Sequence, residues 1–343
     1  MTVGMRYPGD PIRYSDTPDI PANTSLRRCP TLTASWRYSA ERLNALADRL
    51  ADRFTDAWFS VALAGSYGRL DAGPRSDADF LILIKHAPST TAISPVIEHV
   101  RSIIQDLDIP LPNPTGLFSS AISIETVTDG IGGKDDGLHD LARRMVLLLE
   151  AKCVYNEKLF RDATQCVLDA YMRYSHKEPD KQPLMLLNEI IRFFRSVCVN
   201  YEVNFLNEHE KWAIRNAKLR HSRVLMYFGL LSVVLNSSTK TDKEPYIRGQ
   251  LGHTPLERIC HVYSDCGESD VTNLLGPYNV FISSINDPDF RGSLEKAEYH
   301  NRYTYPEYVL MKTTSEALAA ELTRFVLDRR GHWPNKILGY LLF

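Results

Sequence analysis

Two aspartates separated by one residue are the strongest candidates for chemistry in this sequence. Asp77 and Asp79 flank Ala78 and directly precede the apolar run FLILI, which predicts a buried β-strand. Because side chains alternate between the two faces of an extended chain, both carboxylates are expected on one side, with Ala78 in the core. Two neighbouring carboxylates repel each other unless a cation neutralises them, and Mg²⁺ prefers oxygen ligands. The pair therefore predicts a Mg²⁺ site, which Mn²⁺ could also occupy.

A Gly-Ser pair lies shortly before these aspartates. The apolar strand FSVALAG ends at Gly65 and Ser66, and ten residues separate Ser66 from Asp77. Glycine lets the backbone approach a phosphate closely, the Ser66 hydroxyl can donate to its oxygens, and Arg69 adds a charged donor. The expected ligand is a nucleoside triphosphate. Two metal ions about 4 Å apart would activate an attacking hydroxyl and stabilise the leaving pyrophosphate.

The combination LAGS, ten residues, then DAD resembles the signature of the DNA-polymerase-β-like nucleotidyltransferase superfamily. The resemblance covers roughly residues 36–130 and implies a small mixed sheet with helices on one face. The segment LLLEAKCVYNEKLF, residues 147–160, is similar to a leucine-rich helix and turn in the PII-uridylyltransferase-like branch. A Mg²⁺-dependent transfer of a nucleoside monophosphate to a hydroxyl follows from this resemblance.

That superfamily adds a third acid on a neighbouring strand, and Glu125 is the first choice here. In SSAISIETV every second residue up to Glu125 is small or polar, which predicts a strand that could lie beside FLILI. Glu125 is then expected to bind metal and to help deprotonate the acceptor hydroxyl. Asp106, Asp108 and Asp129 remain open alternatives, because strand order and register are not fixed by the sequence.

The periodicity of the chain predicts an α+β protein whose second half is helical. Strand patterns alternate with helical ones up to Gly137, and apolar residues then recur every three to four positions. The expected division is an extended arm over residues 1–35, a nucleotidyltransferase domain over 36–150, a helical domain over 151–330 and an apolar tail over 331–343. The boundary between the two domains is expected near residues 149–157.

A basic segment in the helical half is the candidate partner for the phosphates. KWAIRNAKLRHSR, residues 211–223, holds five Lys and Arg residues and no acid, and Lys211, Arg215 and Lys218 fall on one face of a helix. Lys218, supported by Arg215, is expected to contact the triphosphate or a nucleic-acid backbone. An ordinary solvated basic face is the alternative.

The tail KILGYLLF carries Tyr340, whose hydroxyl could accept the nucleotidyl group. Together with LNEIIRFFR and the basic segment, it resembles the nucleotidyltransferases of bacterial Hailong antiphage systems. That resemblance implies use of dATP or ATP, template-independent synthesis of single-stranded deoxyadenylate oligomers from the tyrosine, and a membrane-channel partner. Two alternatives stay open: nucleotidyl transfer to a protein or small molecule, and a catalytically silent nucleotide sensor.

Composition limits the classes of partner. Forty basic against forty-two acidic residues give a net charge of −2, which excludes binding of nucleic acid through bulk charge alone. The longest apolar run, Val224 to Leu235, is shorter than the roughly 20 residues of a membrane-spanning helix. The first residues lack the apolar core of a secretory signal, so a cytoplasmic location is expected.

Six cysteines are too few for a disulfide scaffold, and most lie within apolar helical patterns. We therefore expect reduced, buried thiols. His253, Cys260, His261 and Cys266 offer metal-ligand types without a recognised spacing, so the sequence does not favour a zinc site there.

Overall fold

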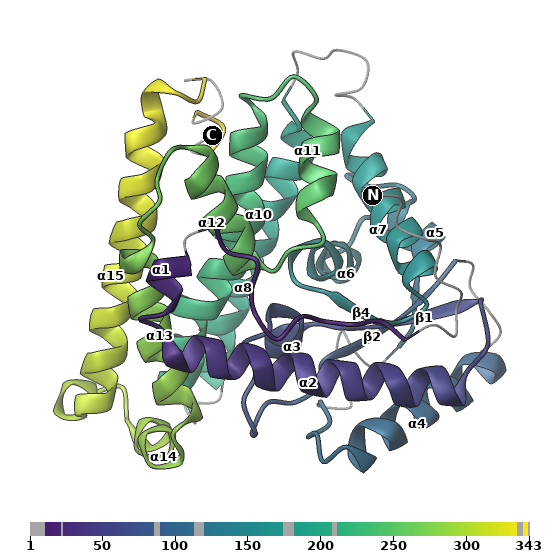
Figure 1. Ribbon diagram of the computed structural model, residues 1–343, viewed down its shortest axis with the longest axis horizontal. Helices are drawn as coiled ribbons and strands as arrows, with labels where there is room; N and C mark the ends of the chain where they lie inside the picture. The colour runs from purple at the N-terminus through teal and green to yellow at the C-terminus, as the bar shows by residue number, and fades with distance from the viewer. Residues whose placement is uncertain are drawn as a thin grey trace. The chain divides into compact units, whose positions relative to one another are not determined.

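The computed structural model describes residues 11–21, 23–85, 90–112, 120–173, 182–207, 211–334 and 339–341 (Figure 1). The chain divides into two compact units, and the main division falls between Leu186 and Leu187. Residues 18–35 belong to the second unit and the remaining N-terminal residues to the first. The division therefore lies later than the boundary expected near 149–157. The outer parts of the expected arm and tail, residues 1–10, 335–338 and 342–343, lie outside the described residues.

A four-stranded sheet is the centre of the first unit, in the order β3-β2-β1-β4. Its strands are β1 (Phe59–Leu63), β2 (Phe80–Ile84), β3 (Ile122–Ser123) and β4 (Lys152–Tyr155). β1 pairs antiparallel with both β2 and β4, whereas β3 is parallel to β2. This mixed sheet confirms the α+β class. β4 lies within the boundary region expected near 149–157 and pairs with β1, and α7 after it packs on β1, β2 and β4, so the first unit extends past that region.

Helices cover both faces of this sheet, not one face as the resemblance implied (Figure 1). On one face, α2 and α4 share a core with alternate strand residues such as Phe59, Val61 and Ile82. On the other face, α7 contacts β1, β2 and β4. The helices of this unit are α2 (Pro30–Arg53, from Trp36 on), α3 (Gly65–Arg69), α4 (Thr90–Asp106), α5 (Ile124–Thr128), α6 (Leu138–Leu149) and α7 (Glu157–Met172).

The described residues 11–17 of the expected arm pack on the first unit. The Tyr14 backbone N–H donates to Asn44 Oδ1 at 2.7 Å, and the Tyr14 hydroxyl donates to the Cys153 carbonyl at 2.5 Å. The Trp36 indole N–H donates to the Ser15 carbonyl at 3.0 Å. This part of the arm is therefore tied to α2 and β4.

The described residues of the second unit form helices and connecting segments only, as predicted. The helices are α1 (Asn23–Leu26), α8 (Leu184–Asn207), α9 (Trp212–Lys218), a π-helical turn (Leu219–Arg223), α10 (Val224–Ser237), α11 (Lys243–Gln250), α12 (Pro255–Asp265), α13 (Thr272–Asn286), α14 (Pro288–Lys296), short 3₁₀ turns (Arg302–Thr304 and Arg329–Gly331) and α15 (Pro306–Asp328). α10 is apolar and buried almost all round, which marks it as a central core helix. Among the described residues, no helix is long and apolar enough to cross a membrane.

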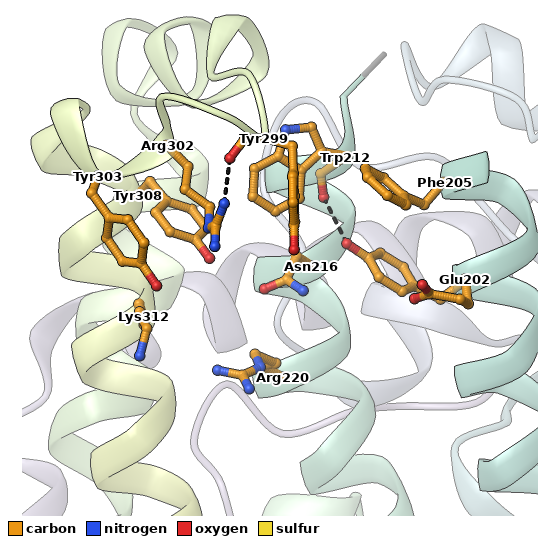
Figure 2. A pocket seen from close by; sticks show the side chains of 11 residues that line it. Glu202, Phe205, Trp212, Asn216, Arg220, Tyr299, Arg302, Tyr303, Tyr308 and Lys312 are labelled. Carbon is orange, nitrogen blue, oxygen red and sulfur yellow. Dashed lines mark hydrogen bonds between the residues drawn. The ribbon is translucent and has the colours of Figure 1, made fainter. Parts of the chain in front are cut away.

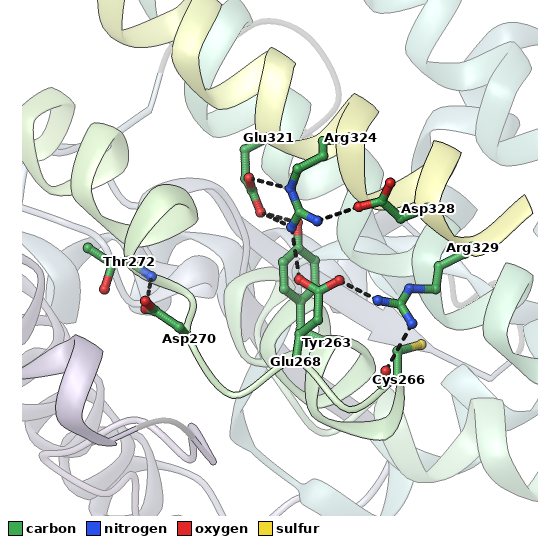
Figure 3. Close-up of polar contacts among 9 residues, drawn as sticks. All are labelled: Tyr263, Cys266, Glu268, Asp270, Thr272, Glu321, Arg324, Asp328 and Arg329. Atoms are coloured by element: carbon green, nitrogen blue, oxygen red, sulfur yellow. Dashed lines mark hydrogen bonds and ion pairs between the residues drawn. The ribbon is translucent and has the colours of Figure 1, made fainter.

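A charged network joins the segment after α12 to the end of α15 (Figure 3). Arg324 donates to Glu268 at 2.8 Å and to Asp328 at 2.6 Å, and Arg329 also donates to Glu268. Burial alone would raise the pKa of Glu268, but the hydrogen bonds from the two arginines outweigh it and hold the pKa below its usual value. This carboxylate therefore contributes stability above its unfolded pKa, and the contribution is lost as the pH falls through its folded pKa.

The short helix α3 packs so closely against the neighbouring strands that one of its positions has no space for a side chain. A Cβ built on Gly68 would lie 2.1 Å from the Glu150 carbonyl oxygen and 2.8 Å from that of Leu63. Both neighbours are backbone atoms, so the helix or the strands would have to move to admit a methyl group.

We expect Gly68→Ala to lower the free energy of unfolding by about 2–3 kcal/mol, because the added methyl group overpacks this contact. Gly249→Ala on α11 is the matched control, since a Cβ there meets no atom within 4 Å. Alanine is also the better helix former, so the control is expected to be neutral or slightly stabilising. Urea unfolding of both variants measures the difference. Equal stability of the two variants would contradict the packing described here.

Candidate active site

The carboxylate of Asp79 lies directly against Gly65 at the joined ends of β1 and β2. The Ala64 backbone N–H donates to the Asp79 carbonyl at 2.7 Å, and Leu63 is paired with Phe80. Gly65 has a φ of +63°, and a Cβ built on it would lie 2.5 Å from Asp79 Oδ2. Position 65 thus needs glycine for two reasons, the left-handed backbone and the approach of a carboxylate.

Asp77 and Asp79 lie on an extended segment in which the middle residue is buried. Ala78 is fully buried, Asp79 is partly exposed and Asp77 is exposed, as alternation along an extended chain requires. The Ala78 backbone N–H donates to the Pro110 carbonyl at 2.9 Å, which holds this segment from the other side. Ser66, the second residue of α3, is partly exposed on the same connection.

The carboxylates of Asp77 and Asp79 suit a Mg²⁺ ion that is also bound by phosphates. Among the described residues, no third His, Cys, Asp or Glu joins Asp77 and Asp79 in a compact group of metal ligands. Mg²⁺ is commonly held by one or two carboxylates, with substrate phosphates and water completing an octahedron. Two carboxylates on one extended segment fit that pattern.

Glu125 does not lie with these aspartates, so the prediction for it is corrected. β3 is only two residues long, with Ser123 paired to Ile84, and Glu125 lies in the first turn of α5. Its backbone N–H donates to the Lys85 carbonyl at 3.4 Å, at the end of β2 opposite to Asp79. The six residues from Asp79 to Lys85 span about 20 Å at the rise of a β-strand, which is far outside metal-ligand range.

The open alternatives to Glu125 differ in position. Asp129 follows α5 and so shares the distant end of the sheet, whereas Asp106 ends α4. Asp108 is exposed and lies two residues before Pro110, whose carbonyl contacts Ala78. Of the three, Asp108 is nearest in sequence to a segment that touches the aspartate pair.

Arg69 is not a phosphate ligand, because its guanidinium is buried in ion pairs. It donates to Asp71 at 3.0 Å and to Glu150 at 2.5 Å, and its side chain is only 8% exposed. The Glu150 side chain is 1% exposed, so the pair connects α3 to the segment before β4 inside the core. The residue that sequence analysis assigned to the nucleotide thus has a structural role.

The remaining predicted residues lie in the second unit. Arg215 is half-buried and Lys218 is exposed on α9, where the predicted basic face ends because the chain continues as a π-helical turn. Tyr340 lies in the described segment 339–341 and is half-buried. Contact of these three residues with a nucleotide stays a prediction.

Tyr67, next to Ser66, has no access to a ligand because it is fully buried. Burial raises the pKa of Tyr67 well above its usual value, and the neighbouring Tyr38 and Asp77 raise it further. The phenol therefore stays protonated, and its ring is not available for stacking on a base.

A second group of metal-ligand types lies in the second unit, and sequence analysis found only part of it. His253 Nε2 and His261 Nε2 lie 3.5 Å and 3.7 Å from Asp19 Oδ2. The ligand atoms of the three residues lie within 4.8 Å of one another and could hold a metal ion. Asp19 is held in place because its N–H donates to Glu257 Oε1 at 2.7 Å.

Cysteine takes no part in that group. Burial raises the pKa of Cys260, so its thiol stays protonated and is a poor metal ligand. Asp19 was missed because it lies far from the histidines in the sequence.

No protein-family model matches this chain, and no curated protein sequence matches it. The assignment of the site therefore depends on the residues and their geometry.

We expect Glu125→Gln to leave Mn²⁺ affinity within about twofold of the unmodified protein, because Glu125 lies at the far end of β2. Asp79→Asn should weaken Mn²⁺ binding at least tenfold, since it removes a charged ligand. Titration followed by electron paramagnetic resonance of free Mn²⁺ measures both. A loss in Glu125→Gln as large as in Asp79→Asn would overturn the corrected assignment.

Proposed function

We propose that this protein is a Mg²⁺-dependent nucleotidyltransferase with a polymerase-β-like catalytic unit. The observation that carries the proposal is the position of Asp79 against Gly65 at the joined ends of β1 and β2, with Asp77 two residues earlier on the same extended segment. The order of strand, short helix beginning at Gly65 and Ser66, paired aspartates and strand supports it. So does the mixed sheet, in which β2 is antiparallel to β1 and parallel to β3.

In this proposal each group at the site has a defined task. Asp77 and Asp79 hold Mg²⁺, which supplies charge neutralisation for the triphosphate and for the leaving pyrophosphate. Gly65 lets the Asp79 carboxylate approach the start of α3, and the Ser66 hydroxyl donates to a phosphate oxygen. The acceptor oxygen forms a bond to the α-phosphorus, the bond from that phosphorus to the bridging oxygen breaks, and pyrophosphate leaves. The proton of the acceptor passes to an aspartate oxygen or to water.

We expect Asp77→Asn and Asp79→Asn each to lower pyrophosphate release at least a hundredfold, because each removes charge stabilisation of the transition state. Both variants should fold, since neither residue is buried. Asp52→Asn, at an exposed position of α2, is the matched control and should retain activity. A coupled pyrophosphate assay with Mg²⁺ and all eight common nucleoside triphosphates measures this. Near-normal release by either site variant would refute the proposal.

The hydroxyl that accepts the first nucleotidyl group in this proposal is that of Tyr340, which is half-buried. The 3′-hydroxyl of each added nucleotide is then the acceptor of the next. Following the resemblance to the Hailong nucleotidyltransferases, we propose template-independent synthesis of single-stranded deoxyadenylate from dATP, in antiphage defence with a membrane-channel partner. A free phenol titrates near pH 10, so deprotonation at neutral pH requires the metal site.

Tyr340→Phe is expected to abolish the addition of nucleotides to the chain without loss of fold, because phenylalanine keeps the ring and removes only the hydroxyl. Intact mass spectrometry after reaction with dATP and Mg²⁺ checks this. The unmodified protein should gain increments of deoxyadenylate that map to its last tryptic peptide. Abundant free product with an unmodified tail would exclude Tyr340 as the acceptor and favour transfer to another molecule.

A further inference from the structure

The second unit contains a pocket lined by aromatic rings and cations, separate from every residue assigned above. It has a volume of about 320 Å³ and lies among α8, α9 and the segment that leads into α15 (Figure 2). This volume is at the lower end of the range for small-molecule sites. Six aromatic side chains line it: Tyr201, Phe205, Trp212, Tyr299, Tyr303 and Tyr308.

The inner rings form a fixed wall. Trp212 is buried, and its indole N–H donates to the Ala297 carbonyl at 2.8 Å. Its ring centroid lies 5.3 Å from that of Tyr299 and 5.2 Å from that of Tyr308, in tilted or edge-on contacts. Tyr201 donates its hydroxyl to the Trp212 carbonyl at 3.2 Å. These contacts hold the wall in one arrangement before any ligand binds.

The outer rings, by contrast, are open to solvent. Tyr299 is 44% exposed and Tyr303 is 57% exposed. The Arg302 guanidinium lies between them, 4.1 Å from the Tyr299 centroid and 4.7 Å from the Tyr303 centroid. Figure 2 shows Arg302 among these rings, with Arg220 and Lys312 on the side below them. Arg302 thus covers part of both rings, and the remaining exposed surface of Tyr303 lies next to positive charge.

The charge of the lining selects the ligand. Arg220, Arg302 and Lys312 are its cations, and Glu202 is its one acid. Lys312 is also paired with Glu316, which is not part of the lining, so the pocket has a smaller positive excess than the lining alone gives. A magnesium triphosphate needs acidic ligands for its metal, and this lining has no pair of carboxylates. The phosphates of a nucleic-acid strand bind to cations without a metal ion. A nucleobase stacks on an aromatic ring, and this stacking contributes to affinity for every type of base.

We infer that this pocket binds a nucleotide unit of a single-stranded nucleic acid. The base stacks on Tyr299 and Tyr303, and Arg220, Arg302 and Lys312 meet the adjacent phosphates. The inference deepens the proposed function, because it gives a growing strand a place of attachment apart from the metal site. The same base and phosphate occur in a free nucleotide, so the test compares the two sources.

Fluorescence anisotropy of a labelled 15-nucleotide deoxyadenylate, in EDTA and at low salt, tests the inference without catalysis. The unmodified protein should bind, and Tyr303→Ala should weaken binding about tenfold through loss of stacking. Tyr303→Phe keeps the π-face and should bind within about twofold of the unmodified protein. Arg302→Ala should also weaken binding. It should reduce the slope of the logarithm of the binding constant against the logarithm of the salt concentration by about the amount expected for one phosphate contact. Lys134→Ala removes one exposed charge from the first unit, which contributes no residue to the pocket, and is the control.

Three outcomes would overturn the inference. In the first, the unmodified protein does not bind the labelled oligomer. In the second, Tyr303→Ala binds it as tightly as the unmodified protein does. In the third, dAMP or dATP displaces the labelled oligomer at the same concentration as unlabelled oligomer does. The last would assign the pocket to a free nucleotide.

Failure of the proposed function is distinguishable from failure of this inference. Asp77→Asn tests turnover alone and should bind the strand as the unmodified protein does. If the protein binds the strand in a Tyr303-dependent way and releases no pyrophosphate, the strand-binding pocket is supported and the proposed nucleotidyltransferase activity is refuted.

Discussion

The ion pair between Arg69 and Glu150 fixes α3 against the segment that enters β4, and the proposed site is built on that contact. Both side chains are almost completely buried, and Asp71 completes the group. Removing one partner of a buried pair leaves an uncompensated charge, which typically costs 3–5 kcal/mol. Gly68 allows the backbone to lie close enough for the pair to form. The helix then begins at Gly65, so its position also determines the contact with Asp79.

The acids near α3 are of two kinds: those paired with Arg69 in the core and those accessible to a metal ion. Asp71 and Glu150 are neutralised inside the core by one arginine, so they are not available to a metal ion. Asp77 and Asp79 lie on the accessible side of the segment before β2. Arg69, the arginine of α3, is already bound to Asp71 and Glu150, so it does not neutralise a triphosphate at this site. In the proposed reaction Mg²⁺ neutralises the charge of the two aspartates and of the phosphates.

Sequence spacing predicted the parts of the site that are local and missed those that depend on distant contacts. β1, the Gly-Ser turn, the aspartate pair and β2 follow from alternation and an unbroken apolar run. Glu125 was misplaced because Ser123 ends β3 and caps α5, with its hydroxyl accepting from the Thr126 N–H at 3.4 Å. A short strand followed by a cap has the same polar spacing as a longer strand. Arg69 was misassigned since its partner Glu150 lies far along the chain.

Residues of the aromatic pocket come from segments about a hundred positions apart, so no periodicity could have assembled them. Their chemistry also differs from that of the aspartate pair, with cations and rings in one unit and carboxylates in the other. With a formal net charge of −2, the chain attracts a polyanion only where its cations are concentrated. An enzyme that modifies a protein or small molecule must release its product after one transfer. A strand that grows from Tyr340 is held covalently at its first nucleotide only, so its later nucleotides are free to move. A stacking site would hold one of those nucleotides while pyrophosphate leaves and the next triphosphate enters, a task that a single transfer does not have.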